Sequence, residues 1–216
     1  MTENVPTATG GAVVSTRALL TCGMIAGPLY VAVVVLQMLT REGFDIGRHP
    51  ASLLSNGALG WIQIANFAVS GLLFVAFAIG LRRLPDAGRW GPLLVGVFGA
   101  GMVLAAVFSA DPVDGFPPGT PLGPPTTISG PGLVHFFVGM IVFLAQIAAC
   151  FVFARRFAAG GERGWALFSV LTGAYFLVAY VALFALQGNR VANIAFAVAI
   201  ALALGWASAL AGHVRD

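Results

Sequence analysis

The sequence predicts an all-α polytopic membrane protein: a six-transmembrane-helix bundle with a short interfacial helix and a long Pro/Gly-rich outer loop. Three observations lead to this class. Of the 216 residues, 59% are hydrophobic and 9% charged, whereas soluble domains have about 45–50% apolar and about 25% charged residues. Six apolar runs reach the ~20 residues that a helix needs to cross a bilayer. All 11 basic residues are arginines, mostly in the connections between these runs.

The six runs are expected to form one transmembrane domain, residues 18–211, between a disordered tail at 1–17 and a short tail at 212–216. The first run is longer than the apolar core of a signal peptide, so we interpret it as a retained span. The last connection is so short that spans five and six must form an antiparallel pair. The expected spans are 18–40, 60–81, 90–110, 132–154, 164–186 and 191–211.

The arginines predict the orientation. Cytoplasmic connections of membrane proteins carry an excess of basic residues. Counted by side, eight arginines fall with the two tails and three on the opposite side, so we expect a multi-pass protein of the plasma (inner) membrane with both termini cytoplasmic. The eight are Arg17, Arg82, Arg83, Arg89, Arg155, Arg156, Arg163 and Arg215, and the three are Arg41, Arg48 and Arg190.

The same composition argues against several function classes. The basic residues form no patch that could follow a phosphate backbone, so we expect no nucleic acid partner. Cys22 and Cys150 both lie inside spans, too few and too deep for a disulfide framework or a thiolate metal site. No glycine motif opens a helix after a strand, which disfavours nucleotide cofactors. No histidine pair is stacked through the bilayer, which disfavours haem.

The first span and the connection after it contain helix-breaking residues. Gly27-Pro28 predicts a kink in span one, with Tyr30 on the face beyond it. The segment 48–57 reads as a short interfacial helix with Pro50 near its first position and Gly57 as its end. Ser52 and Ser55 would share one face of that helix, at the outer membrane boundary.

Span two carries a polar stripe. Gln63, Asn66 and Ser70 recur at intervals of three and four residues, so they lie on one helix face. Because polar groups in lipid need partners, this face must point into the bundle. It could line a ligand pocket, or it could supply hydrogen bonds between helices.

The third connection is unusual. Residues 111–131 contain seven prolines and four glycines, a composition that forms neither a helix nor a strand, so we expect an ordered lid or a mobile flap. The glycines of span three, Gly96, Gly99 and Gly101, are expected to allow close helix packing.

Four segments bring polar or ionisable groups to the outer boundary, which predicts a pocket there. The candidate catalytic residues are Asp111, His135, His49, Ser52 and Ser55, and the candidate ligand-binding residues are Gln63, Asn66, Asp114, Arg190, Asn193 and Tyr30.

Three chemistries would use this set. A divalent metal such as zinc could be held by His49, Asp111 and His135 and activate a water molecule. Ser52 or Ser55 could be a nucleophile activated by a histidine that Asp111 orients. Asp111 and His135 could act as general acid and base on a lipid-borne group. Each residue also has a purely structural interpretation: solvated loop carboxylates, a helix-anchoring histidine, and interhelical hydrogen bonds.

Several motifs occur over about residues 20–210: Gly27-Pro28, His49-Pro50-Ala51-Ser52-Leu53-Leu54-Ser55, Gly60-Trp61-Ile62-Gln63-Ile64-Ala65-Asn66-Phe67 with Gly71, Asp111-Pro112, and His135. Together they resemble the DUF998 family of prokaryotic integral membrane proteins. The resemblance implies the six-span architecture and supports the choice of residues, but that family is by name a domain of unknown function. A fainter likeness to the Frag1/DRAM/Sfk1 membrane proteins favours a link to lipids.

Three function hypotheses follow. The first is a membrane-embedded enzyme acting on a lipid, isoprenoid or other amphiphile that enters an outward-facing pocket. The second is a non-catalytic ligand-binding or transport protein, although a polar path to the cytoplasmic side is not evident in the sequence. The third is a structural membrane subunit. Membrane lipids are the expected partners, together with an amphiphilic small-molecule substrate.

Overall fold

The computed structural model describes residues 14–86, 88–125 and 127–215, and within them the chain is helical and has six helices long and apolar enough to cross a membrane. Most of the tail predicted over residues 1–17 therefore lies outside the described residues. The membrane helices are α1 (Thr16–Thr40), α2 (Gly60–Arg82), α3 (Trp90–Val107), α4 (Gly130–Ala159), α5 (Arg163–Ala185) and α6 (Arg190–Arg215), with a short 3₁₀ helix, η1 (Ala51–Ser55), before α2.

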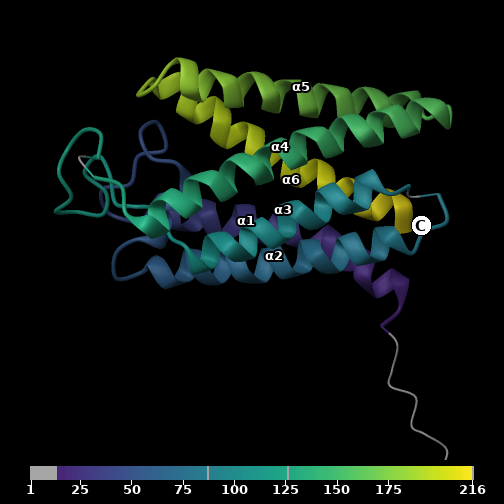
Figure 1. The fold of residues 1–216 in the computed structure, drawn as a ribbon, viewed down its shortest axis with the longest axis horizontal. Coiled ribbons are helices and arrows are strands. Elements are labelled where there is room, and N and C mark those ends of the chain that lie inside the picture. The colour runs from purple at the N-terminus through teal and green to yellow at the C-terminus, as the bar shows by residue number, and fades with distance from the viewer. Residues whose placement is uncertain (1–13, 87, 126, 216) are drawn as a thin grey trace, which may run out of the picture.

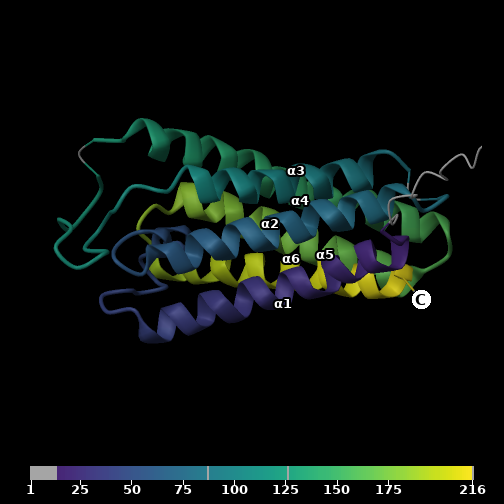
Figure 2. The ribbon, with the colours of Figure 1, turned by 90° about the horizontal axis from the view of Figure 1, so that it is seen from below.

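The helices run alternately up and down in a ring (Figures 1 and 2). Each packs against the next in sequence, and α6 returns to pack against α1. The connections 41–59 and 108–129 lie together at one end of the ring, which we call the loop end. The start of α1 and the C-terminus lie at the opposite end, which we call the terminal end.

Glycines set the closest helix contacts. A Cβ atom on Gly71 would lie 2.7 Å from the carbonyl oxygen of Gly99, and one on Gly99 would lie 2.8 Å from that of Gly71. A Cβ atom on Gly27 would likewise collide with the Leu204 carbonyl of α6. Close to this contact, Ser208 of α6 donates a hydrogen bond to the Gly23 carbonyl at 3.0 Å. The expected packing role of the span-three glycines is therefore observed for Gly99 and for Gly101, where a Cβ would overlap the Val142 side chain of α4, whereas a Cβ on Gly96 would make only an ordinary contact with Ala78.

The ring is filled at the terminal end. Large side chains there are almost completely inaccessible, and the Phe153 and Trp206 rings pack edge to face with centroids 5.8 Å apart. The Trp206 indole also donates to Ser169 at 2.9 Å. The fully buried aromatic side chains of this core are Phe74, Phe77, Phe153 and Trp206.

Several helix ends differ from the sequence prediction. The α3 helix stops at Val107 rather than at 110, whereas α4 runs to Ala159 rather than to 154. The α6 helix continues to Arg215, so the predicted C-terminal tail is helical up to that residue. There His213 meets Glu162 at 2.6 Å and stacks on Trp165, and these contacts extend the helix beyond its apolar run.

Candidate functional site

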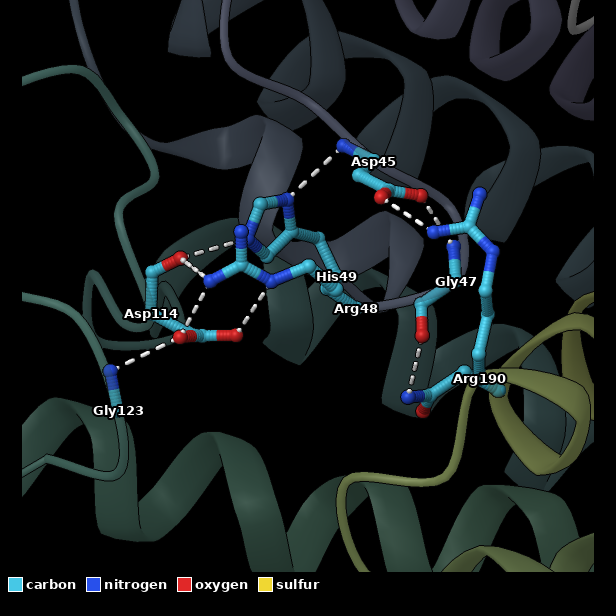
Figure 3. A network of polar contacts seen from close by, with 8 residues as sticks. Asp45, Gly47, Arg48, His49, Asp114, Gly123 and Arg190 are labelled. Atoms are coloured by element: carbon cyan, nitrogen blue, oxygen red, sulfur yellow. Dashed lines mark hydrogen bonds and ion pairs between the residues drawn. The ribbon is translucent and has the colours of Figure 1, made fainter.

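His49 joins the two long connections at the loop end. The residue is 1% exposed, and its ring packs against the rings of Phe44 and Phe116, which also contact each other. The Asp45 backbone N–H donates to Nδ1 at 3.0 Å, so Nε2 carries the proton and donates to the Asp114 carbonyl at 2.9 Å (Figure 3). Both ring nitrogens are therefore occupied, and His49 acts here as a structural connector.

Two ion pairs surround this histidine (Figure 3). Arg48 binds the Asp114 carboxylate with two hydrogen bonds, of 2.9 and 2.6 Å, and Arg190 binds Asp45 at 2.6 Å. The hydrogen bond from the Arg48 guanidinium lowers the pKa of the Asp114 carboxyl below its ordinary value. The hydrogen bond from Arg190 lowers the pKa of Asp45 in the same way.

Asn193 completes the link to α6. Its side-chain amide donates to the Gly47 carbonyl at 3.0 Å, one turn along the helix from Arg190. Together these contacts tie the segment 45–51, which we call the strap, to the N-terminus of α6. Arg190 and Asn193 were predicted to bind a ligand; in the structure they bind Asp45 and Gly47 of the protein itself.

Asp111 and His135 connect α3 to α4. Asp111 accepts hydrogen bonds from the Ser129 backbone N–H at 2.8 Å and from its hydroxyl at 2.5 Å, and the same Ser129 caps α4 through Gly132. His135 Nδ1 donates to the Phe108 carbonyl at 2.7 Å, because a carbonyl can only accept. Its other nitrogen, Nε2, has no hydrogen-bond partner among the residues that the structure describes.

The polar stripe of α2 faces α1, inside the ring. The Gln37 amide donates to Gln63 at 2.9 Å, Gln63 donates to the Tyr30 hydroxyl at 3.3 Å, and Asn66 donates to the Tyr30 carbonyl at 3.2 Å. Ser70 bonds Asn66 at 3.3 Å. The interior position expected for this stripe is observed, with the stripe forming hydrogen bonds between helices.

A cavity of about 260 Å³ lies in the loop-end half of the ring. Side chains from all six helices and from residues 50–52 form its wall, which is overwhelmingly aromatic and aliphatic. Three of the predicted site residues are among them: Tyr30, Ser52 and His135.

The chamber predicted from the sequence is assembled only in part. Ser52 and His135 share the cavity, whereas His49, Asp111 and Asp114 are engaged elsewhere by protein partners. Ser55 is turned back onto the Ser52 carbonyl at 2.7 Å. Asp111 binds Ser129, and the His135 nitrogen that it would orient binds Phe108, so the predicted triad is not formed.

The structure does not bring the metal candidates His49, Asp111 and His135 together. Within the described ranges, no group of three His, Cys, Asp or Glu side chains could hold a metal ion. His49 is buried against two aromatic rings, with both nitrogens bonded, while Asp111 and His135 bind groups at the junction of α3 and α4.

Three features of the site were left out of the predicted set. Gln37 belongs to the buried polar chain; its position seven residues after Tyr30 places both on one helix face, but it was not included among the site residues. Ser129 is the hub at the start of α4, and Ser129-Gly130-Pro131 is a helix-start pattern. The aromatic wall, formed by residues such as Phe98 and Phe196, has no distinguishing pattern in so apolar a sequence.

Comparison with known proteins identifies the family of the chain. No curated protein and no solved structure matches the chain. A family model described as "Protein of unknown function (DUF998)" matches residues 24–213, which include α2 to α5 completely, α1 from Met24 and α6 up to His213. The chain therefore belongs to the DUF998 family.

Proposed function

We propose that this protein is a multi-pass protein of the plasma membrane that binds the apolar chain of a lipid or isoprenoid in the loop-end cavity. The main observation that supports this proposal is the cavity itself, whose wall combines side chains of all six helices with residues 50–52. Ligand pockets are concave and mostly apolar, with a few polar groups that orient the ligand. Ser52, Tyr30 and His135 are such groups.

Packing energetics favour an occupant. The lining of an empty apolar space loses dispersion contacts, and an apolar cavity offers water no hydrogen bonds. Helices in a bilayer gain nothing from burying apolar surface away from lipid, because the chains are equally apolar. A lipid chain would therefore enter to fill space and restore contacts.

The arginines support an orientation. With eight arginines at the terminal end and three at the loop end, the positive-inside rule places the terminal end in the cytoplasm. The cavity then belongs to the outer leaflet, and its ligand comes from the outer leaflet or from outside the cell.

Filling the cavity tests the proposal. A Cβ on Gly139 meets only the Phe143 ring, at 3.8 Å, so Gly139→Phe places a ring in the cavity without a backbone clash. The matched control is Gly205→Phe, since Gly205 is exposed on α6 with nothing near its Cβ. A photoreactive oleic acid should label wild type and Gly205→Phe equally, at cavity residues such as Met102 and Met140, and Gly139→Phe far less. Equal labelling of all three proteins would refute it.

A second candidate is an esterase that cleaves the bound lipid. Ser52 and His135 line the same cavity, and His135 Nε2 lacks a bond to any described residue. The Ser52 hydroxyl would attack an ester carbonyl while Nε2 accepts its proton and passes it to the leaving alcohol; water would then release the acid from the acyl-serine.

The enzyme candidate has its own test. His135→Gln retains an N–H donor for the Phe108 carbonyl but removes the basic nitrogen, and Ser52→Ala removes the nucleophile. Both should stop hydrolysis of a fluorescent phospholipid ester while the proteins keep wild-type thermal stability. Hydrolysis at the wild-type rate in both, or none in wild type, removes this candidate and leaves lipid binding intact.

A further inference from the structure

A second cavity, of about 320 Å³, lies between α1 and α6. These helices touch closely in the terminal-end half, where Gly27 meets the Leu204 carbonyl and Ser208 bonds Gly23. Toward the loop end they diverge, and aliphatic side chains such as Val35 on α1 and Ala197 on α6 line the space between them.

The strap lines this space at the loop end. Asp45 binds Arg190 and Gly47 binds Asn193, and Ile46, His49, Pro50 and Ala51 of the strap line the cavity directly. The space therefore reaches from the strap to the close contact at Gly27. Exposed Val35 and Val198 at its sides lie on the lipid-facing surface.

The two cavities are separated by a shared wall. Tyr30, Pro50, Ala51, Phe196 and Ile200 line both. Two of these, Pro50 and Ala51, lie at the loop end, so both cavities reach the loop end beside the strap. Ser52 lines the first cavity there, and His49 and Asn193 line the second.

We infer that the ligand is a two-chain glycerolipid, with one acyl chain in each cavity and its glycerol and headgroup at residues 50–52. This inference rests on the proposed function and specifies its ligand class. Two neighbouring apolar cavities of similar volume, which share one wall and are both lined by Pro50 and Ala51 at the loop end, match two chains that diverge from a single glycerol. A single-chain amphiphile would fill only one of them.

The test compares two lipids that differ only in chain number: dioleoylphosphatidylglycerol and 1-oleoyl-lysophosphatidylglycerol. Their affinities for the purified full-length protein are measured by native mass spectrometry. Wild type and Gly205→Phe should prefer the two-chain lipid by about fivefold or more. Ala197→Phe, which fills only the α1–α6 cavity, should abolish that preference by weakening the two-chain lipid and leaving the single-chain lipid unchanged.

The outcomes separate this inference from the proposed function. If Ala197→Phe retains the preference, or weakens both lipids equally, the two-chain inference is overturned. Gly139→Phe should weaken both lipids; if it weakens neither, the proposed function itself fails. If Ala197→Phe does not fold, Val35→Trp fills the same cavity from α1 and should likewise abolish the preference for the two-chain lipid.

Discussion

At Gly71 and Gly99 the backbones of α2 and α3 meet, and each glycine faces the carbonyl of the other. A methyl group at either position would contact backbone, which cannot move aside as a flexible side chain can. Gly96, on the same helix as Gly99, would place its Cβ at an ordinary 3.5 Å from Ala78. A side chain is therefore tolerated at Gly96 but not at Gly99, although the sequence pattern does not distinguish the two positions.

Gly99→Ala should destabilise the protein by about 1–3 kcal/mol, the usual cost of overpacking a tight contact. Gly96→Ala is the matched control and should be neutral or slightly stabilising, because alanine favours helix more than glycine does. Thermal unfolding of both variants in one detergent measures the difference. Equal melting temperatures would contradict the close approach of α2 and α3.

Gln63 lies at the centre of the buried polar chain, bonded to Gln37, Tyr30 and Asn66. Gln63→Leu leaves partners of this side chain without hydrogen bonds, which costs about 1–3 kcal/mol when the groups stay buried. Ser70→Ala, at the end of the chain, should cost less. A thermal unfolding series that ranks Ser70→Ala as the more damaging change would refute this account of the chain.

The sequence predicted this stripe for a general reason. Polar side chains at three- and four-residue spacing in an apolar helix must face the protein interior. It could not assign partners, because hydrogen bonds to Tyr30 and Gln37 depend on how α1 is rotated against α2. For the same reason, the sequence could place Asp111 near the start of α4 but could not show that Ser129 uses its carboxylate.

At the scale of elements, the strap and the 108–129 connection are held by Asp45, Asp114 and His49. The pKa values of both aspartates are lowered by their arginine partners. A lowered native pKa means that these contacts contribute full stability above the ordinary carboxyl pKa of 3.8 and lose it as the pH falls further, through the lowered native values.

Wild-type protein should therefore lose thermal stability as the pH falls from about 5 to about 2, and Asp45→Asn/Asp114→Asn should lose less over the same range. The double variant already lacks the ion pairs at neutral pH, so its curve starts lower and is flatter. Asp86→Asn, in the exposed connection between α2 and α3, is the control and should follow wild type. Parallel curves for the double variant and wild type would exclude these pairs as the cause.

Helix existence followed directly from the sequence, whereas helix ends did not. The six apolar runs and the short helix after Pro50 all appear at the expected places. The ends of α4 and α6 extend further because contacts outside the apolar runs, such as Glu162 with His213, stabilise additional turns. Such contacts join segments that are far apart in the chain, so no local sequence pattern predicts them.

For the whole molecule, the ring topology places both described ends of the chain on one face. The arginine distribution predicts that this face is cytoplasmic. Single cysteines at Ser15 and Ser129, introduced into a chain without Cys22 and Cys150, should react oppositely with a membrane-impermeant maleimide in intact cells: Ser129→Cys labelled, Ser15→Cys protected. The reverse pattern would invert the orientation and move the cavity to the inner leaflet.

The sequence predicted a polar pocket at the outer boundary, but the apolar wall of the loop-end cavity could not be predicted, because it arises where the ring is left unfilled and not from any motif. The most direct test of its role is an experimental density map of the protein in lipid nanodiscs. Elongated density between Phe98, His135 and Phe196, continuing to the mouth at Ser52, is the predicted result. Side chains collapsed into that space, with no density between them, would contradict lipid binding there.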